Sequence, residues 1–147
     1  MKRGFTLVEI MIVVAVIALL AAIAIPNILR ARHNANEASA IASLRAISTA
    51  MEGYRGAQIP SEYTGATLST LRSSSPPYMD TKLGSGSKQG YDFVLNIDSA
   101  QTYDATGTPQ QYHTTGTRSF IVQEDGVIKC LDNSGAALAR GEGTALD

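Results

Sequence analysis

The chain has 147 residues, a formal net charge of −1, one Cys and no Trp. This length suits one domain, or one small domain with an appendage. The near-neutral charge and the lack of a Lys/Arg run argue against a nucleic-acid-binding surface. A single Cys excludes an internal disulfide framework and every multi-cysteine metal site.

The amino-terminal segment is far more apolar than the rest of the chain. Of the 21 residues from Phe5 to Ile25, all but Thr6 and Glu9 are apolar, and neither Gly nor Pro interrupts the run. As a helix it would be about 31 Å long at about 1.5 Å per residue, which matches the ~30 Å hydrocarbon core of a bilayer. We therefore predict a membrane-spanning helix over residues 5–25.

A cleaved secretory signal is the alternative interpretation of this segment. Lys2 and Arg3 would be its charged start, and residues 22–24, Ala-Ile-Ala, its cleavage site. The apolar run of residues 10–25 slightly exceeds the usual ~7–15 residues of such a signal. Glu9 argues against it more strongly, because an ionisable group in a bilayer costs about 2.5–3.5 kcal/mol and marks a functional site.

The segment Gly4-Phe5-Thr6-Leu7-Val8-Glu9 follows a short basic leader and precedes the apolar helix. In this arrangement it resembles the class III signal of type IV pilins and their pseudopilin relatives. The resemblance extends over roughly residues 1–55, and Pro26 stands where many members have a helix-bending proline. It implies that a prepilin peptidase removes residues 1–4 by cutting between Gly4 and Phe5 on the cytoplasmic side, and that Phe5 is then N-methylated. The processed chain would have a side-chain charge of −3.

Glu9 lies four residues from the amine that this cleavage would place on Phe5. The two charges can pair within one helix or between staggered helices of neighbouring subunits. In either case each charge loses most of its burial penalty, and a pair between subunits also fixes the axial register. The resemblance implies the second arrangement, which makes Phe5 and Glu9 an assembly site. A Glu9 side chain that merely anchors the helix end among lipid headgroups is the alternative.

The predicted span is apolar on every side, so lipid or copies of itself must bury it. Its alanines allow helices to approach closely. A head-to-tail contact that repeats without closing produces a helical filament. The residues alone also leave open a simple membrane anchor.

Residues 26–56 continue the helix with a different pattern. Pro26 removes an amide donor and predicts a kink. Beyond it, apolar side chains recur on one face with the helical period, so this half is amphipathic and should pack on a sheet. The members of that face are Ile41, Leu44, Ile47, Met51 and Tyr54.

Residues 57–90 are rich in Pro, Gly and Ser and are predicted as a connecting region, with Leu68 and Leu71 on a short helical turn. Residues 91–131 are predicted as the sheet. Its strands are residues 91–97, a weaker candidate at 101–105, and a hairpin of 118–123 and 127–131 around an Asp-Gly turn.

The tail, residues 132–147, shows little patterning and is expected to be loosely ordered. The predicted fold class is α+β: a long amino-terminal helix, membrane-spanning in its first half, packed on a small antiparallel sheet of three or four strands. This is a pilin-like plan.

The search for catalytic or ligand sites gives no positive prediction. His33 and His113 lack partners at metal-ligand spacing, and residues 84–88, Gly-Ser-Gly-Ser-Lys, lack the spacing of a phosphate loop. We predict no catalytic residues, no metal site and no cofactor. Cys130 has no partner and is expected to be buried and inert, which departs from the many pilins whose carboxy-terminal loop a disulfide closes.

Glu124, Asp125 and Asp132 could gather a Ca²⁺ ion, as in the major pseudopilin group, but the acidic residues are sparse and the turn explains Asp125 better.

The leading hypothesis is a non-enzymatic structural subunit, the prepilin of a type IV pilus-type filament. It would lie in the inner membrane as a single-pass protein, with the amino terminus cytoplasmic and the globular part periplasmic, and then enter an extracellular filament or a periplasmic pseudopilus. Its expected partners are identical subunits, inner-membrane lipid, the prepilin peptidase and methyltransferase, and the assembly platform, with no nucleic acid. The alternatives are a pseudopilin of a type II secretion system and, from another class, a periplasmic binding module with a cleaved signal peptide.

Overall fold

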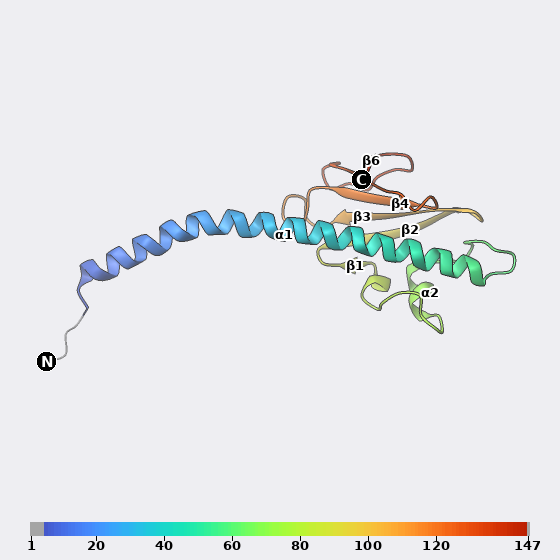
Figure 1. Ribbon diagram of the computed structural model, residues 1–147, viewed down its shortest axis with the longest axis horizontal. Coiled ribbons are helices and arrows are strands. Elements are labelled where there is room, and N and C mark those ends of the chain that lie inside the picture. The colour runs from blue at the N-terminus through green and yellow to red at the C-terminus, as the bar shows by residue number, and fades with distance from the viewer. Residues whose placement is uncertain (1–4, 147) are drawn as a thin grey trace. The chain divides into compact units, whose positions relative to one another are not determined.

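The computed structural model describes residues 5–146 and has an α+β fold (Figure 1). The helices are α1 (Leu7–Ala57), α2 (Leu68–Ser73) and a short 3-10 helix, η1 (Leu83–Ser85). The strands are β1 (Ser87–Lys88), β2 (Tyr91–Ser99), β3 (Thr102–Pro109), β4 (Ser119–Gln123), β5 (Ile128–Leu131) and β6 (Thr144–Ala145). The chain divides into two compact units between Arg32 and His33, and each is described separately.

The first unit contains the apolar part of α1, and the helix predicted over residues 5–25 is confirmed from Leu7 onward. Its apolar side chains lie open on all sides, from Leu7 at 76% exposure to Ile25 at 57%. Within residues 5–146, α1 alone is long and apolar enough to cross a membrane, and its most apolar 18-residue window has a mean hydropathy of 3.0. No residue in the described part of the chain buries this surface.

Pro26 lies inside α1, and the helix continues through it. A proline has no amide donor for the carbonyl one turn earlier, which weakens the helix at this point. The carbonyl left without its donor is that of Ala22. The Asn27 side chain reinforces the adjacent turn, because its Nδ2 donates to the Ile23 carbonyl at 3.1 Å. The kink at Pro26 stays a prediction.

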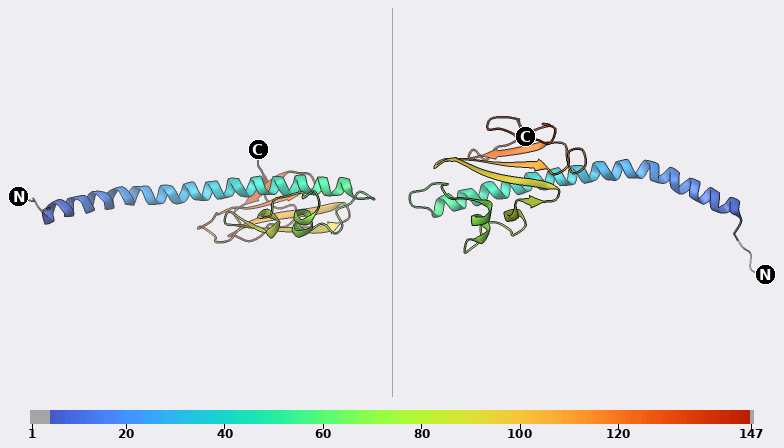
Figure 2. Two further views of the ribbon diagram at one scale, coloured as in Figure 1. Left: turned by 90° about the horizontal axis from the view of Figure 1, so that it is seen from below. Right: turned by 180° about the vertical axis from the view of Figure 1, so that it is seen from behind.

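The second unit is built on the amphipathic half of α1, as the sequence predicted. Leu44, Ile47 and Met51 are fully buried, and Ile41 and Tyr54 pack at the margin of the same core. The sheet lies along this part of the helix (Figure 2). Alternate residues of each strand point toward α1, as strand geometry requires. These strand residues are Tyr91, Phe93, Tyr103, Ala105, Phe120, Val122, Ile128 and Cys130.

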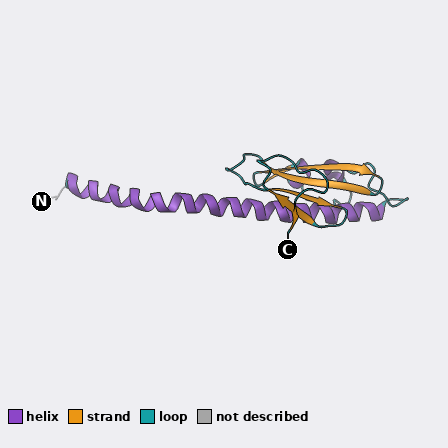
Figure 3. Ribbon diagram, turned by 90° about the horizontal axis from the view of Figure 1, so that it is seen from above, coloured by secondary structure: helices purple, strands orange, loops and turns teal. Residues whose placement is uncertain are grey.

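The sheet has six antiparallel strands in the order β1-β2-β3-β4-β5-β6, more than the three or four expected. The two additional strands, β1 and β6, have two residues each, too few to form a sequence pattern. The long strands of the sheet stand out in the view coloured by secondary structure (Figure 3). The weaker strand candidate becomes β3, eight residues long. It lacks alternation because both of its faces are buried over most of its length.

The predicted hairpin and helical turn are both confirmed. β4 pairs with β5 in the register Val122↔Ile128, around a turn in which the Gly126 amide donates to the Gln123 carbonyl at 2.9 Å. Gly126 has φ +71°, which glycine adopts without strain. Leu71 of α2 is fully buried in the core.

The expectation of a loosely ordered tail is wrong. Leu138 is buried, and β6 pairs with β5 through Cys130↔Thr144. Arg140 forms ion pairs with Asp98 and Glu124 and donates to the Tyr103 carbonyl at 3.1 Å. No sequence pattern indicates this order, because it depends on contacts with distant strands rather than on a periodic repeat.

A buried carboxylate joins α1 to the loop between β3 and β4. The side chain of Glu37 is 7% exposed, and its Oε2 lies 2.7 Å from an Arg118 guanidinium nitrogen. Its Oε1 accepts from the amide and hydroxyl of Thr117, both at 3.1 Å. One residue earlier, Asn36 donates to the Thr115 carbonyl at 2.9 Å. These bonds lie at the amino-terminal limit of the core and hold the loop against the helix.

The Glu37 carboxylate should make stability depend on pH. Burial raises its pKa, but the hydrogen bonds from Arg118 and Thr117 outweigh that effect and hold the pKa below its usual range. The stabilisation is therefore fully present above the ordinary Glu pKa of about 4.3 and is lost as the pH falls through the lower pKa of the folded state. Glu37→Gln should lower the free energy of unfolding by about 1–3 kcal/mol at pH 7 and should flatten this acid dependence.

Denaturant unfolding of the full chain in detergent micelles, followed by circular dichroism between pH 3 and 7, measures both effects. Glu142→Gln is the control, because that carboxylate is exposed. An acid profile that is unchanged by Glu37→Gln would contradict the assignment.

Candidate functional site

The amino-terminal end of α1 is organised by two side chains, Thr6 and Glu9. The Glu9 Oε2 atom accepts from both the backbone amide and the hydroxyl of Thr6, each at 2.8 Å. In return, the Glu9 amide donates to the Thr6 hydroxyl at 3.2 Å. This reciprocal pattern is a capping box, with Thr6 as the N-cap and Glu9 at the third helical position. It satisfies backbone donors that the first turn of a helix otherwise leaves free.

The capping box explains how a carboxylate is retained at the top of an apolar helix. Unpaired charge and unpaired backbone amides are both costly in lipid, and here each supplies the other's hydrogen bonds. All of its atoms belong to Thr6 and Glu9, so removal of residues 1–4 would leave it intact. Phe5, the residue before the N-cap, would then carry the free amine.

The structure shows contacts for some of the predicted site residues and not for others. It joins Glu9 to Thr6, and Phe5 lies at the end of the helix with its side chain 80% exposed. Gly4, the other residue of the predicted cleavage site, lies outside the described residues. Pairing of Glu9 with a Phe5 amine stays a prediction.

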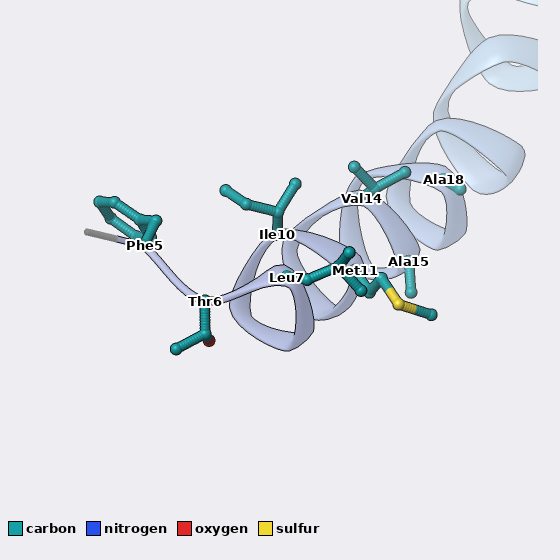
Figure 4. A pocket seen from close by; sticks show the side chains of 8 residues that line it. All are labelled: Phe5, Thr6, Leu7, Ile10, Met11, Val14, Ala15 and Ala18. Carbon is teal, nitrogen blue, oxygen red and sulfur yellow. The ribbon is translucent and has the colours of Figure 1, made fainter.

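An open apolar groove runs along α1 from Phe5 to Ala18 (Figure 4). Ile10, Val14 and Ala18 form one row along the helix, and Leu7, Met11 and Ala15 form the row beside it. Members of each row are four residues apart, which is the spacing of the ridges that interlock when two helices pack. Both rows end in Ala, so a second helix can approach most closely there. The groove is therefore shaped for another helix.

The residues considered for calcium have other partners. Glu124 pairs with Arg140, and Asp125 accepts from the Val127 amide at 2.9 Å within its turn. Asp132 accepts from the Tyr112 hydroxyl at 2.9 Å. Among residues 5–146, no three His, Cys, Asp or Glu side chains gather as metal ligands.

The histidines and the cysteine belong to three different segments of the fold. His33 is on α1, and His113 lies in the β3–β4 loop, with its ring centroid 3.9 Å from that of Tyr112. Cys130 is buried, as expected, with its Sγ 3.9 Å from an Arg118 nitrogen.

Sequence reasoning overlooked Thr6 as a site residue. The signal was present, because Thr-x-x-Glu before an apolar run is the sequence pattern of a capping box. This pattern is easy to overlook, because Glu9 stands out as an isolated charge and Thr6 as a neutral interruption of the apolar span.

Comparison with known proteins agrees with this geometry. The family profile described as "Prokaryotic N-terminal methylation motif" matches residues 1–25. The "Type IV wide pilus major component PilA4" of Thermus thermophilus is 33% identical over 119 residues, covering 78% of this chain and 88% of that protein. The "Type II secretion system core protein G" of Pseudomonas aeruginosa is 29% identical over 117 residues, covering 80% and 77%.

A third relative is similar only near the amino terminus. The "Type IV major pilin protein PilA" of Myxococcus xanthus is 48% identical over 53 residues, covering 36% of this chain but only 24% of that protein. No solved structure matches the chain significantly. Because the Thermus relative is matched over most of its length, the chain belongs to the type IV pilin and pseudopilin family.

The capping box predicts a defined effect for Thr6→Val, which keeps the shape of the side chain but removes the hydroxyl. The start of α1 should lose about 0.5–2 kcal/mol of local stability, which is the usual effect of losing a cap. Amide hydrogen exchange at residues 7–9, measured with the chain in lipid nanodiscs, should become faster. Thr6→Ser keeps the hydroxyl and should exchange like the unaltered chain. Equal exchange in both variants would show that the cap does not stabilise the helix start.

Proposed function

We propose that this chain is the prepilin of a type IV pilus-type filament and serves as a structural subunit. The observation that carries the proposal is the exposed apolar half of α1, which no residue from 5 to 146 covers and which has at its end a carboxylate bonded back to its own helix. Family membership supports the same function, since pilins and pseudopilins are structural subunits rather than enzymes.

In this proposal the subunit lies in the inner membrane before processing and assembly, with α1 across the bilayer. A prepilin peptidase then cuts between Gly4 and Phe5, and Phe5 is N-methylated. The assembly platform next transfers the subunit from lipid into a bundle of like helices. The apolar surface stays out of water throughout, so the hydrophobic cost of each transfer is small.

The capping box gives the proposed Phe5–Glu9 contact a specific geometry. Thr6 engages Oε2 of Glu9, and Oε1 makes no hydrogen bond with any residue from 5 to 146. That oxygen is available to a Phe5 amine of a neighbouring helix. The same carboxylate is thus stabilised by its own helix in the membrane and by a second charge after assembly. In a low-dielectric bundle such a pair favours one axial register over others.

A pseudopilin of a type II secretion system is the second candidate. It is supported by the relatives named "Type II secretion system core protein G", of which the Pseudomonas protein matches over 77% of its length. Both candidates use the same processing and helix packing. They differ in the filament's destination, which is outside the cell for a pilus and within the periplasm for a pseudopilus.

Processing is tested by the mature amino terminus. The purified protein should begin at N-methylated Phe5 in mass spectrometry, and Gly4→Leu should retain Lys2 and Arg3 because a bulky side chain blocks the cleavage. Gly4→Ala is the matched conservative variant and should retain more cleavage. A mature chain that begins at Ile25 would contradict the proposal and support a periplasmic module with a cleaved signal peptide.

Assembly is tested by electron microscopy of cells in which this protein is the sole major subunit of a pilus assembly system. Glu9→Ala should insert into the membrane normally but reduce filament number about tenfold or more, because the partner amine loses its counter-charge. Val13→Ala, a truncation in the same apolar helix, is the control. Abundant normal filaments from Glu9→Ala would rule out the pairing. An absence of filaments from the unaltered chain would instead count against the filament function.

A further inference from the structure

We propose that the basic neck of α1, defined by Arg30 and Arg32, binds the acidic end of the globular unit in a second copy of this chain. This inference rests on the proposed filament function and goes beyond it, because it adds an electrostatic contact to the packing of the apolar helices. The acidic end is defined by six acidic residues of the second unit, in the last turns of α1, in the segment that follows it, and around the β2–β3 and β4–β5 turns: Glu52, Glu62, Asp98, Asp104, Glu124 and Asp125.

The neck carries charge that nothing nearby neutralises. Arg30 and Arg32 are both exposed, and neither forms an ion pair with any residue from 5 to 146. Between Glu9 and Glu37 the sequence contains no acidic residue, so no carboxylate lies within one helical turn of either arginine. The two guanidinium groups are therefore available to another molecule.

The globular unit has the opposite charge. Residues 33–147 contain eight Lys and Arg against twelve Asp and Glu. Six of the twelve acids belong to the acidic end, and the cations that pair with them are Arg55 and Arg140. The remaining acids and bases of the unit balance in number. Its excess negative charge is thus concentrated at one end.

Several contacts bring the acidic end together. Tyr103 lies close enough to Glu52, Glu124 and Asp125 for all three charges to raise its pKa, although burial is the main cause of the increase. The ring of Tyr63, which follows Glu62, lies 4.9 Å from that of Tyr103.

Two strand residues complete the group. Asp98 shares Arg140 with Glu124, and Asp104 lies opposite Gln123 in the sheet.

Two carboxylates of this end are left without a cation. Glu52 pairs with Arg55, Asp98 and Glu124 pair with Arg140, and Asp104 is buried with Asn96 as its partner. Glu62 and Asp125 form no ion pair with any described residue, and Asp125 is exposed. Two unpaired arginines on one copy therefore match two unpaired carboxylates on another.

The proposed register offsets neighbouring copies along the filament axis. Pairing of the Phe5 amine with Glu9 of a neighbour displaces the two helices by four residues, roughly 6 Å along the axis. Repeated over successive copies, this displacement lets the neck of one copy meet the acidic end of another. The contact joins two different patches, so it is head-to-tail and extends a filament without closing. Charge complementarity of this kind also steers subunits into one orientation.

The test is charge reversal and rescue in the cells used for filament imaging. Arg30→Glu combined with Arg32→Glu should reduce filament number about tenfold or more, and Glu62→Lys combined with Asp125→Lys should do the same. All four changes in one chain reverse both sides of the contact and should restore filaments. Membrane insertion should persist, because loss of arginines after the span does not oppose the proposed orientation.

A matched control is Arg45→Glu combined with Lys82→Glu, which removes two other exposed and unpaired cations and changes the net charge equally. It should assemble normally. Normal filaments from the neck variant would overturn the inference, as would equal loss in the control or failure of the four-residue exchange to rescue. Failure of rescue would be the result expected if the neck instead bound anionic lipid headgroups. Because the unaltered chain forms filaments in each of these cases, such a result leaves the proposed function standing.

Discussion

The proposed function of this protein depends on one interaction, the hydrogen bonding of a carboxylate at the start of an apolar helix. In lipid, the first turn of α1 has backbone donors with no water to receive them, and Glu9 has a charge with no water to solvate it. The bonds between Thr6 and Glu9 solve both problems within four residues. The other carboxylate oxygen has no hydrogen bond to any residue from 5 to 146, and in the proposed filament it is the atom that meets a neighbouring subunit.

The second half of α1 is subject to a different constraint. Here the helix must be apolar on one face only, because the other face meets water while the buried face completes the core of a small sheet. Leu44, Ile47 and Met51 supply that face, and Glu37 and Asn36 fix the β3–β4 loop at the amino-terminal limit of the core. Without α1, the core side chains of the sheet would lie open to water, and a sheet needs a covered apolar face to be stable. The globular unit therefore depends on the helix for its stability.

The sequence predicts the parts of this molecule that follow from local periodicity. The apolar run, the Leu44–Met51 face and the Asp125-Gly126 hairpin are repeating or short-range patterns, and the structure has all three. It does not predict features made by partners distant in the chain. Glu37 meets Arg118 across 81 residues, and Arg140 meets Asp98 across 42, so neither pair leaves a pattern. Within the candidate site, the sequence shows Glu9 as an isolated charge in a Thr-x-x-Glu pattern. Only the structure shows that the Glu9 side chain turns back and bonds to Thr6.

The way in which the carboxy-terminal segment is held has a consequence for biogenesis. Arg140, rather than a covalent crosslink, fastens this segment to two strands, and the lone thiol is enclosed beside Arg118. Folding therefore needs no oxidase or isomerase, and thiol reductants should leave the folded unit untouched. The same fastening responds to ionic strength, because its side chains are partly open to water and dissolved salt screens their attraction. Ionic strength, rather than redox conditions, is therefore the variable expected to weaken this contact.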